Sequence, residues 1–128
     1  MKLSIFSGTE AYHTAIANAL EDVTSLTELS EKIKKSSYSP IVFKDNQRKA
    51  ENYLSADLVA LDVDDGATLD DLKQFFCDFR VIISTTRNHM KEKNGKVAER
   101  YRVILFPEQP ITRREDYEAT MKWLASQY

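Results

Sequence analysis

The sequence predicts an α+β fold in which helices pack on a mixed, largely antiparallel sheet. Three apolar, β-prone runs carry this prediction, at residues 58–63, 81–86 and 101–106. A helical pattern joins the first two runs, so these strands are expected to be parallel, either as neighbours or with one strand between them. The segment between the second and third runs is polar and has no helical pattern, which favours an antiparallel hairpin.

The remaining elements follow from local signals. Thr68, with Asp70 and Asp71 after it, predicts the start of a helix with one apolar face, formed by Leu69, Leu72, Phe75, Phe76 and Phe79. Thr112 predicts the cap of a final helix. The other expected elements are a strand at 2–7, helices at 14–20 and 25–35, a breaker at 36–40, a strand at 41–43 and a polar turn at 44–49. This order is typical of a ferredoxin-like or RNA-recognition-motif sandwich.

Length and composition bound the class of protein. With 128 residues, 42% of them hydrophobic and 30% charged, we expect one globular domain that spans residues 1–128. Its last residues continue a helical pattern without a stop signal, so we expect the N-terminal fragment of a longer protein. No apolar run approaches the roughly 20 residues that cross a membrane, and the single cysteine excludes an internal disulfide. We expect a cytoplasmic protein without a membrane partner and with Cys77 in the core.

Two aspartates close the apolar run at 58–63. Side chains alternate across a strand, so Asp62 and Asp64 are expected on one face at its carboxyl end, and Asp65 is expected to belong to the turn. Carboxylates this close repel unless a cation lies between them, and their oxygens suit Mg²⁺ or Mn²⁺ with substrate phosphates. The alternative is an acidic strand end that runs into a turn and a helix N-terminus, where aspartate is favoured.

Charge is unevenly distributed, although a net charge of −2 does not itself indicate a nucleic-acid binder. Residues 57–71 contain six aspartates and no basic residue, whereas residues 87–102 contain six basic residues and two acids. A metal on one side and phosphates on the other fit this pattern, and so does a solvated, charge-rich hairpin loop. The basic residues are Arg87, Lys91, Lys93, Lys96, Arg100 and Arg102.

Candidate phosphate-binding groups follow the acidic strand in sequence. The strand at 81–86 ends in hydroxyl residues, and Arg87 and His89 come next, all of which hydrogen-bond phosphates. Arg100 and Arg102 alternate with apolar neighbours, so both are expected on one face of the strand at 101–106. The alternatives are a solvated surface histidine and a strand side that faces solvent.

Three segments in this order carry a resemblance to a known family. They are Leu-Asp-Val-Asp-Asp-Gly at 61–66, Ser-Thr-Thr-Arg-Asn-His at 84–89 and Arg-Tyr-Arg-Val-Ile-Leu-Phe-Pro at 100–107. Together they resemble the archaeo-eukaryotic primase superfamily, most closely the primase-polymerase domains of phage and plasmid replication proteins. The segment at 43–48 also resembles phage members, so the resemblance covers about residues 40–112. The third motif of the family, a further metal-binding aspartate after a later strand, has no match, because Asp116 lies in a helical pattern.

The resemblance implies a primase core that makes or extends DNA primers by metal-dependent nucleotidyl transfer. Asp62 and Asp64 would bind Mg²⁺ or Mn²⁺, and with His89 they would be the catalytic residues. The nucleotide triphosphate would meet Ser84, Thr86, Arg87, His89, Arg100 and Arg102. Template DNA would meet Arg48, Lys91, Lys93 and Lys96. A helicase domain or other replication proteins are the further expected partners, in a bacterial or phage-infected cell.

Two readings from other classes stay open. A haloacid-dehalogenase-like phosphatase has a strand that ends in Asp-x-Asp-Gly-Thr, which residues 62–68 nearly match, and Asp62 would then be its nucleophile. Three features argue against a phosphatase of this family: the position of the motif in the chain, an extra residue in the turn and the absence of the later motifs. A non-catalytic nucleic-acid or protein-binding module on the same fold would need exposed aromatic residues to stack bases, and Tyr101 is the strand aromatic in a suitable place.

Overall fold

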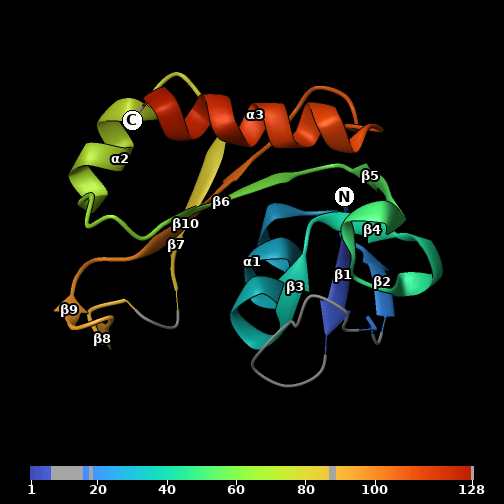
Figure 1. Ribbon diagram of the computed structural model, residues 1–128, viewed down its shortest axis with the longest axis horizontal. Coiled ribbons are helices and arrows are strands. Elements are labelled where there is room, and N and C mark those ends of the chain that lie inside the picture. The colour runs from blue at the N-terminus through green and yellow to red at the C-terminus, as the bar shows by residue number, and fades with distance from the viewer. Residues whose placement is uncertain (7–15, 18, 87–88, 128) are drawn as a thin grey trace. The chain divides into compact units, whose positions relative to one another are not determined.

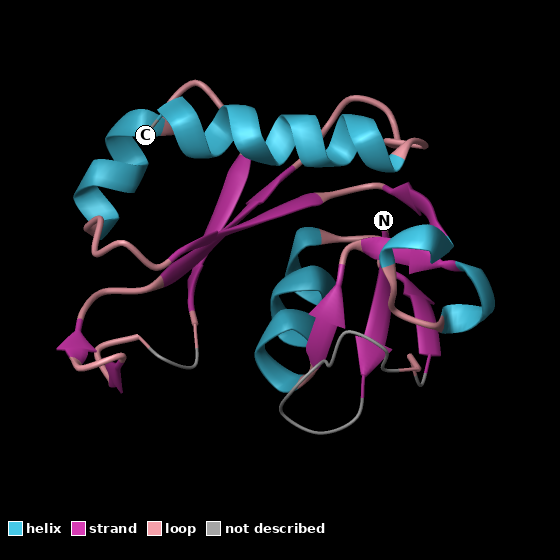
Figure 2. Ribbon diagram, in the orientation of Figure 1, coloured by secondary structure: helices cyan, strands magenta, loops and turns pink. Residues whose placement is uncertain are grey.

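The structure is a computed structural model that describes residues 1–6, 16–17, 19–86 and 89–127. The chain divides into two compact units, Met1–Leu58 with Pro107–Thr120, and Val59–Phe106 with Met121–Tyr128. Helices and antiparallel sheets occur together, as Figure 1 and Figure 2 show, so the predicted α+β class is confirmed. The organisation as one domain stays a prediction.

The first unit contains a three-stranded antiparallel sheet and one helix between two of its strands. The central strand buries Leu3 and Phe6. The helix begins as predicted, because the Ser25 hydroxyl accepts a hydrogen bond from the backbone N–H of Glu28 at 3.1 Å. In sheet order the strands are β2 (Ala19–Asp22), β1 (Lys2–Phe6) and β3 (Ser37–Ser39), and the helix is α1 (Leu26–Lys35).

A two-stranded antiparallel sheet completes the strands of this unit. It consists of β4 (Ile41–Phe43) and β5 (Tyr53–Ala56), with the short 3₁₀ turns η1 (Lys44–Asn46) and η2 (Ala50–Asn52) between them. Ala56 and Ile111 exchange backbone hydrogen bonds of 3.0 and 2.8 Å, which ties the later segment of the unit to β5.

The second unit contains the predicted acidic strand. Its strand order is β6-β10-β7, and β10 pairs antiparallel with both neighbours. The strands β6 and β7 are therefore parallel with one strand between them, and the predicted antiparallel pairing of the second and third runs is confirmed. This is a split β-α-β arrangement, while the finer ferredoxin-like class stays a prediction. The elements are β6 (Val59–Val63), α2 (Leu69–Phe75), β7 (Val81–Thr85), β8 (Glu92–Lys93), β9 (Lys96–Val97) and β10 (Tyr101–Leu105).

The helix α2 begins where the sequence predicts. The Thr68 hydroxyl accepts from the Asp71 N–H, and the Asp71 carboxylate accepts from the Thr68 N–H, each at 3.1 Å, which is a capping box. The helix is shorter than the apolar pattern, so Phe79 lies beyond its end and is exposed. Cys77 is also exposed, and the prediction that it belongs to the core is wrong.

Two sequence predictions in the first unit do not hold, and one strand was missed. Of the helix expected at 14–20, residues 14, 15 and 18 lie outside the described part, while Ala19 and Leu20 belong to β2. They pair with β1, so pairing in the fold overrides helical propensity. The expected breaker at 36–40 contains β3, which pairs with the other edge of β1. The strand β5 was not predicted.

The last helix, α3 (Arg114–Gln127), begins two residues after its predicted cap, Thr112. The N–H of Tyr117 donates to the carbonyl of Arg113, which marks the first helical hydrogen bond described there. Among the described residues, no helix has the length and apolar character needed to cross a membrane.

We predict that Tyr53 makes the first unit sensitive to alkaline pH. Its hydroxyl donates to the carbonyl of Ile111 at 2.6 Å, and burial, followed by the charges of Tyr117 and Asp116, raises its pKa to about 12. The unfolded chain loses this proton near its ordinary pKa of 10.0, so stability is fully present below pH 10 and falls as the pH approaches 12. Urea unfolding between pH 8 and 11, followed by circular dichroism, should show a shallower alkaline decline for Tyr53→Phe. Equal slopes for the two proteins would contradict the prediction.

Candidate functional site

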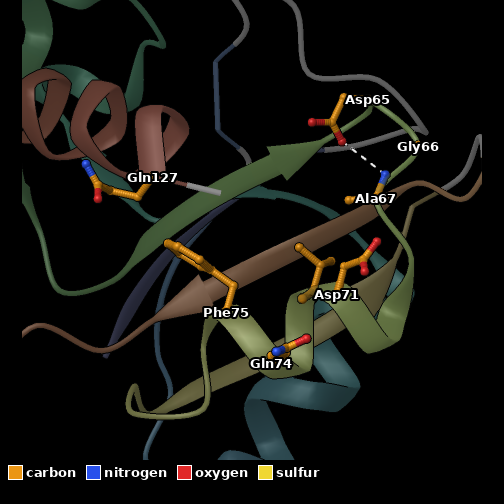
Figure 3. A pocket seen from close by; sticks show the side chains of 8 residues that line it. Asp65, Gly66, Ala67, Asp71, Gln74, Phe75 and Gln127 are labelled. Carbon is orange, nitrogen blue, oxygen red and sulfur yellow. Dashed lines mark hydrogen bonds between the residues drawn. The ribbon is translucent and has the colours of Figure 1, made fainter.

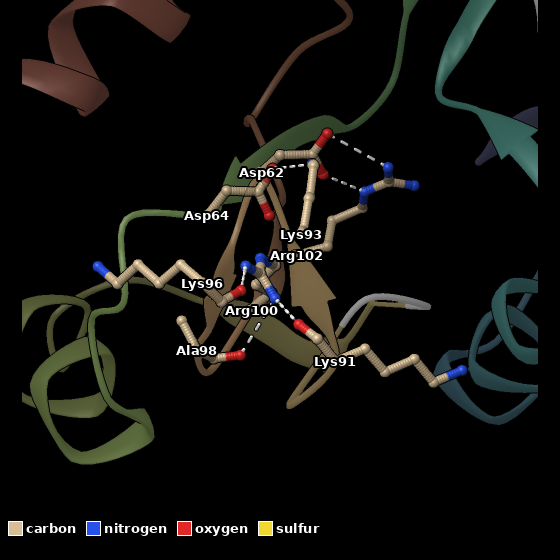
Figure 4. A network of polar contacts seen from close by, with 8 residues as sticks. All are labelled: Asp62, Asp64, Lys91, Lys93, Lys96, Ala98, Arg100 and Arg102. Carbon is tan, nitrogen blue, oxygen red and sulfur yellow. Dashed lines mark hydrogen bonds and ion pairs between the residues drawn. The ribbon is translucent and has the colours of Figure 1, made fainter.

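The carboxyl end of β6 presents two acids on one side of the strand. Leu61 and Val63 are buried, whereas Asp62 and Asp64 are exposed, as the alternation of side chains along a strand requires. Their side chains are 53% and 45% accessible to solvent. The two carboxylates are therefore on the same, solvent-facing side, and Figure 4 shows them together with the basic residues around them.

Asp62 forms an ion pair across the sheet. The register of β10 places Arg102 opposite Asp62 on β6 and opposite Ser84 on β7. The Arg102 Nε donates to Oδ1 of Asp62 at 2.6 Å, and its Nη2 donates to Oδ2 at 3.3 Å (Figure 4). Both carboxylate oxygens thus accept from one guanidinium, which is the two-pronged geometry that arginine also offers to phosphates.

Asp64 forms a second ion pair with the hairpin of β8 and β9. The Lys93 Nζ lies 3.3 Å from Oδ2 of Asp64. Lys93 precedes a tight turn in which Asn94 and Gly95 have φ angles of 55° and 76°. Positive φ at both positions is the requirement of a type I′ hairpin turn, which Asn-Gly meets readily. The Asn-Gly pair at 94–95 is a more specific sequence signal for this hairpin than the polar loop predicted there.

Arg100 is buried under this hairpin. Only 3% of it is accessible, and its guanidinium donates to three backbone carbonyls, to Lys91 at 2.6 Å, Lys96 at 2.8 Å and Ala98 at 3.4 Å. The strand β10 begins after it, at Tyr101. The structure therefore does not group Arg100 with the half-exposed Arg102, as the sequence predicted. We assign Arg100 to holding the hairpin in place.

His89 lies at the base of the same hairpin. Its Nδ1 lies 3.1 Å from the backbone nitrogen of Arg100 and 3.2 Å from the Arg100 carbonyl oxygen, so the backbone of Arg100 holds this side of the ring. The ring centroid lies 4.9 Å from that of Tyr101. Nearby, the N–H of Thr86 donates to the carbonyl of Arg100, and the buried Thr86 Oγ1 has no hydrogen-bond partner among the described residues. Arg87 lies outside the described residues.

Tyr101 is not available to stack a base. The residue is buried, and its hydroxyl donates to Oε1 of Glu99 at 2.8 Å. Burial, and next the hydrogen bond to Glu99, raises the pKa of the Tyr101 phenol. The expectation that Tyr101 lies on an exposed face of the sheet is therefore wrong, which removes the aromatic residue that a base-stacking module would use.

The remaining predicted residues belong to the first unit or to the hairpin of β8 and β9. Arg48 belongs to the first unit, where its guanidinium lies 5.7 Å from the ring centre of Phe6. Lys91 and Lys96 are exposed on the hairpin. The Lys96 Nζ lies close to Gly66. If Gly66 carried a Cβ atom, that atom would lie 3.6 Å from the Lys96 Nζ. Gly66 has a φ of 92°, which favours glycine.

An open depression of about 590 Å³ lies beside α2 (Figure 3). Its two acids are engaged by the backbone, Asp65 by the Ala67 N–H at 3.1 Å and Asp71 by the capping box. These carboxylates complete a turn and a helix start, so the depression adds no catalytic group to the site. It is lined by Asp65, Gly66, Ala67, Asp71, Leu72, Gln74, Phe75 and Gln127.

The donor set at the end of β6 suits a hard divalent cation. Two exposed carboxylates on one side of a strand supply oxygen ligands, and Mg²⁺ or Mn²⁺ sites of this kind take further oxygens from water and substrate phosphates. Across the described ranges, no three or more His, Cys, Asp or Glu residues form a group that could hold a metal ion. The fit therefore rests on Asp62 and Asp64.

Comparison of the chain with protein-family models, curated proteins and solved structures found no match. The resemblance to primase-polymerase domains stays a prediction. The geometry of the site joins two acids, an arginine and a lysine at one end of a three-stranded sheet.

We predict that Arg100→Gln destabilises the second unit by about 2–3 kcal/mol, because partly buried carbonyls of the hairpin lose a charged donor. Urea unfolding followed by circular dichroism measures the change. Lys91→Ala is the matched control, since it removes an exposed side chain and leaves the carbonyl that accepts from Arg100. A loss for Arg100→Gln no larger than that of the control would show that the hairpin does not depend on this guanidinium.

Proposed function

We propose that this chain carries a site for metal-dependent nucleotidyl transfer that serves DNA primer synthesis or extension from nucleotide triphosphates. One observation carries the proposal. Two carboxylates that suit a divalent cation lie on one side of a strand end, within ion-pair distance of an arginine and a lysine that suit phosphates. The order of the three sequence segments that resemble primase-polymerase domains supports the same function.

In this proposal Asp62 and Asp64 bind Mg²⁺ or Mn²⁺. Both residues suit this role because they are exposed and supply carboxylate oxygens. When bound, the metal supplies charge neutralisation of the triphosphate and activation of the attacking hydroxyl. Arg102 binds phosphate oxygens from the central strand, and the Ser84 hydroxyl, its neighbour in register, is a further donor.

The hairpin and the loop beside it complete the proposed site. His89, held by the backbone of Arg100, orients its Nε2 toward the incoming nucleotide. The exposed side chains of Lys91 and Lys96 bind the phosphates of the template DNA, because basic side chains supply the sequence-independent part of DNA binding. We place this activity in the cytoplasm of a bacterial or phage-infected cell, alongside a helicase domain or other replication proteins.

Calorimetric titration of Mn²⁺ together with a non-hydrolysable deoxynucleoside triphosphate tests the proposal. We expect metal-dependent binding to the wild-type chain and its loss in Asp62→Asn/Asp64→Asn, because the amides remove both anionic ligands. The control is Asp70→Asn/Asp78→Asn, which removes two exposed acids of the same unit and changes the net charge equally. Equal binding by the two double variants, or none by the wild type, would contradict the proposed site.

A second measurement separates this function from the phosphatase alternative. A nucleophilic Asp62 would carry a phosphoryl group after incubation with Mg²⁺ and an aryl phosphate. Under the proposed function Asp62 is a metal ligand, and we expect mass spectrometry to find no added phosphoryl group on the peptide that contains it. An adduct that disappears in Asp62→Asn would instead establish covalent catalysis.

A further inference from the structure

Each acid of the proposed metal site already forms an ion pair with a basic side chain of the protein. Arg102 reaches both oxygens of Asp62, and Lys93 reaches Oδ2 of Asp64. A divalent metal needs these same oxygens as ligands. The bare metal ion must therefore compete with two side chains, whereas a metal that arrives with a triphosphate brings new anionic partners for both of them.

We propose that Arg102 and Lys93 make the site selective for a metal–triphosphate complex over the bare metal ion. In the free protein the two side chains neutralise Asp62 and Asp64. When the complex binds, Asp62 and Asp64 bind its metal, and the cationic groups of Arg102 and Lys93 move to its phosphates. This inference rests on the proposed function and adds the order in which its ligands can bind.

The positions of the two cations suit such an exchange. Arg102 is fixed by its backbone in the central strand, with partners in register on both sides, so a change of side-chain rotamer moves its guanidinium without disturbing the sheet. The same planar fork that meets the two oxygens of Asp62 can meet two oxygens of a phosphate. Arg102 is therefore prepared for either partner.

The Lys93 side chain can also change its conformation while the hairpin that carries it stays fixed. Its side chain is 41% accessible to solvent, and Nζ is a point charge on a flexible stem. The hairpin below it is anchored by the Arg100 guanidinium on the carbonyls of Lys91 and Lys96. The lysine can therefore leave Asp64 while the hairpin stays in place.

The exposure of these ion pairs sets the size of the effect. With side chains 31–53% accessible, both pairs are partly screened by water. An exposed pair of this kind is worth at most about a fivefold factor in competition with another ligand. Such a factor is large enough to weaken binding of the bare ion and small enough for a triphosphate complex to overcome.

The test measures two dissociation constants for each variant, that of Mn²⁺ alone and that of a non-hydrolysable deoxynucleoside triphosphate at saturating Mn²⁺. For Arg102→Gln we expect Mn²⁺ alone to bind about fivefold more tightly and the triphosphate about tenfold more weakly. Lys93→Gln should change both constants in the same directions. Arg102→Lys should give values between those of Arg102→Gln and the wild type, because lysine keeps the charge but lacks the planar fork. Lys73→Gln, which removes an exposed charge from α2, is the control for a general change in net charge.

Changes of the two dissociation constants in opposite directions support the exchange. A purely structural role for Arg102 cannot strengthen the binding of one ligand and weaken the binding of the other. Should Arg102→Gln fail to fold, Lys93→Gln gives the same test. Both constants moving together, or a change equal to that of Lys73→Gln, would overturn the inference while Asp-dependent binding still supports the function. Absence of binding that depends on Asp62 and Asp64 in every variant would overturn the proposed function, and the inference with it.

Discussion

The pairing of β10 with both of its neighbours is the constraint on which the site depends. This register puts Arg102 opposite Asp62 on one side and Ser84 on the other, and it puts Val103 opposite the buried Leu61. A slip of one residue would turn every side chain of β10 to the other face. Arg102 would then face the apolar side and Val103 would face solvent. Burial of the apolar face therefore also fixes the charge pairing on the opposite face.

A second constraint links the sheet to the hairpin of β8 and β9. Two-residue strands have too few hydrogen bonds to hold a hairpin, and a marginal hairpin needs support from the rest of the fold. Arg100 supplies it, since a buried guanidinium must be satisfied and the hairpin carbonyls satisfy it. The Asn94-Gly95 turn then sets where the strands reverse. The contacts of Arg100 and the Asn94-Gly95 turn, which lie outside the candidate site, therefore position Lys93 next to Asp64.

Strand periodicity was enough to predict the side of β6 on which Asp62 and Asp64 lie, because the alternation of burial along a strand is local. The cap at Thr68 was predictable for the same reason, as capping needs only neighbouring residues. What the sequence did not reveal depends on distant partners: the strands β3 and β5, the burial of Arg100 and the partner of each acid. Cys77 illustrates the limit, since α2 ends before it and leaves it exposed, although its neighbours in sequence are aromatic.

The two ion pairs also decide how variants of the site can be interpreted. Exposed pairs contribute about 0–1 kcal/mol to stability, so the sheet does not depend on them. Its stability comes from the buried side chains on the other face, among them Val63 and Val103, each of which is fully buried. Replacing Asp62 with asparagine or Arg102 with glutamine therefore changes charge at the site and leaves the packed face intact. Binding changes in such variants report on the chemistry of the site, and the stability of the sheet explains little of why two acids and two cations lie at this strand end.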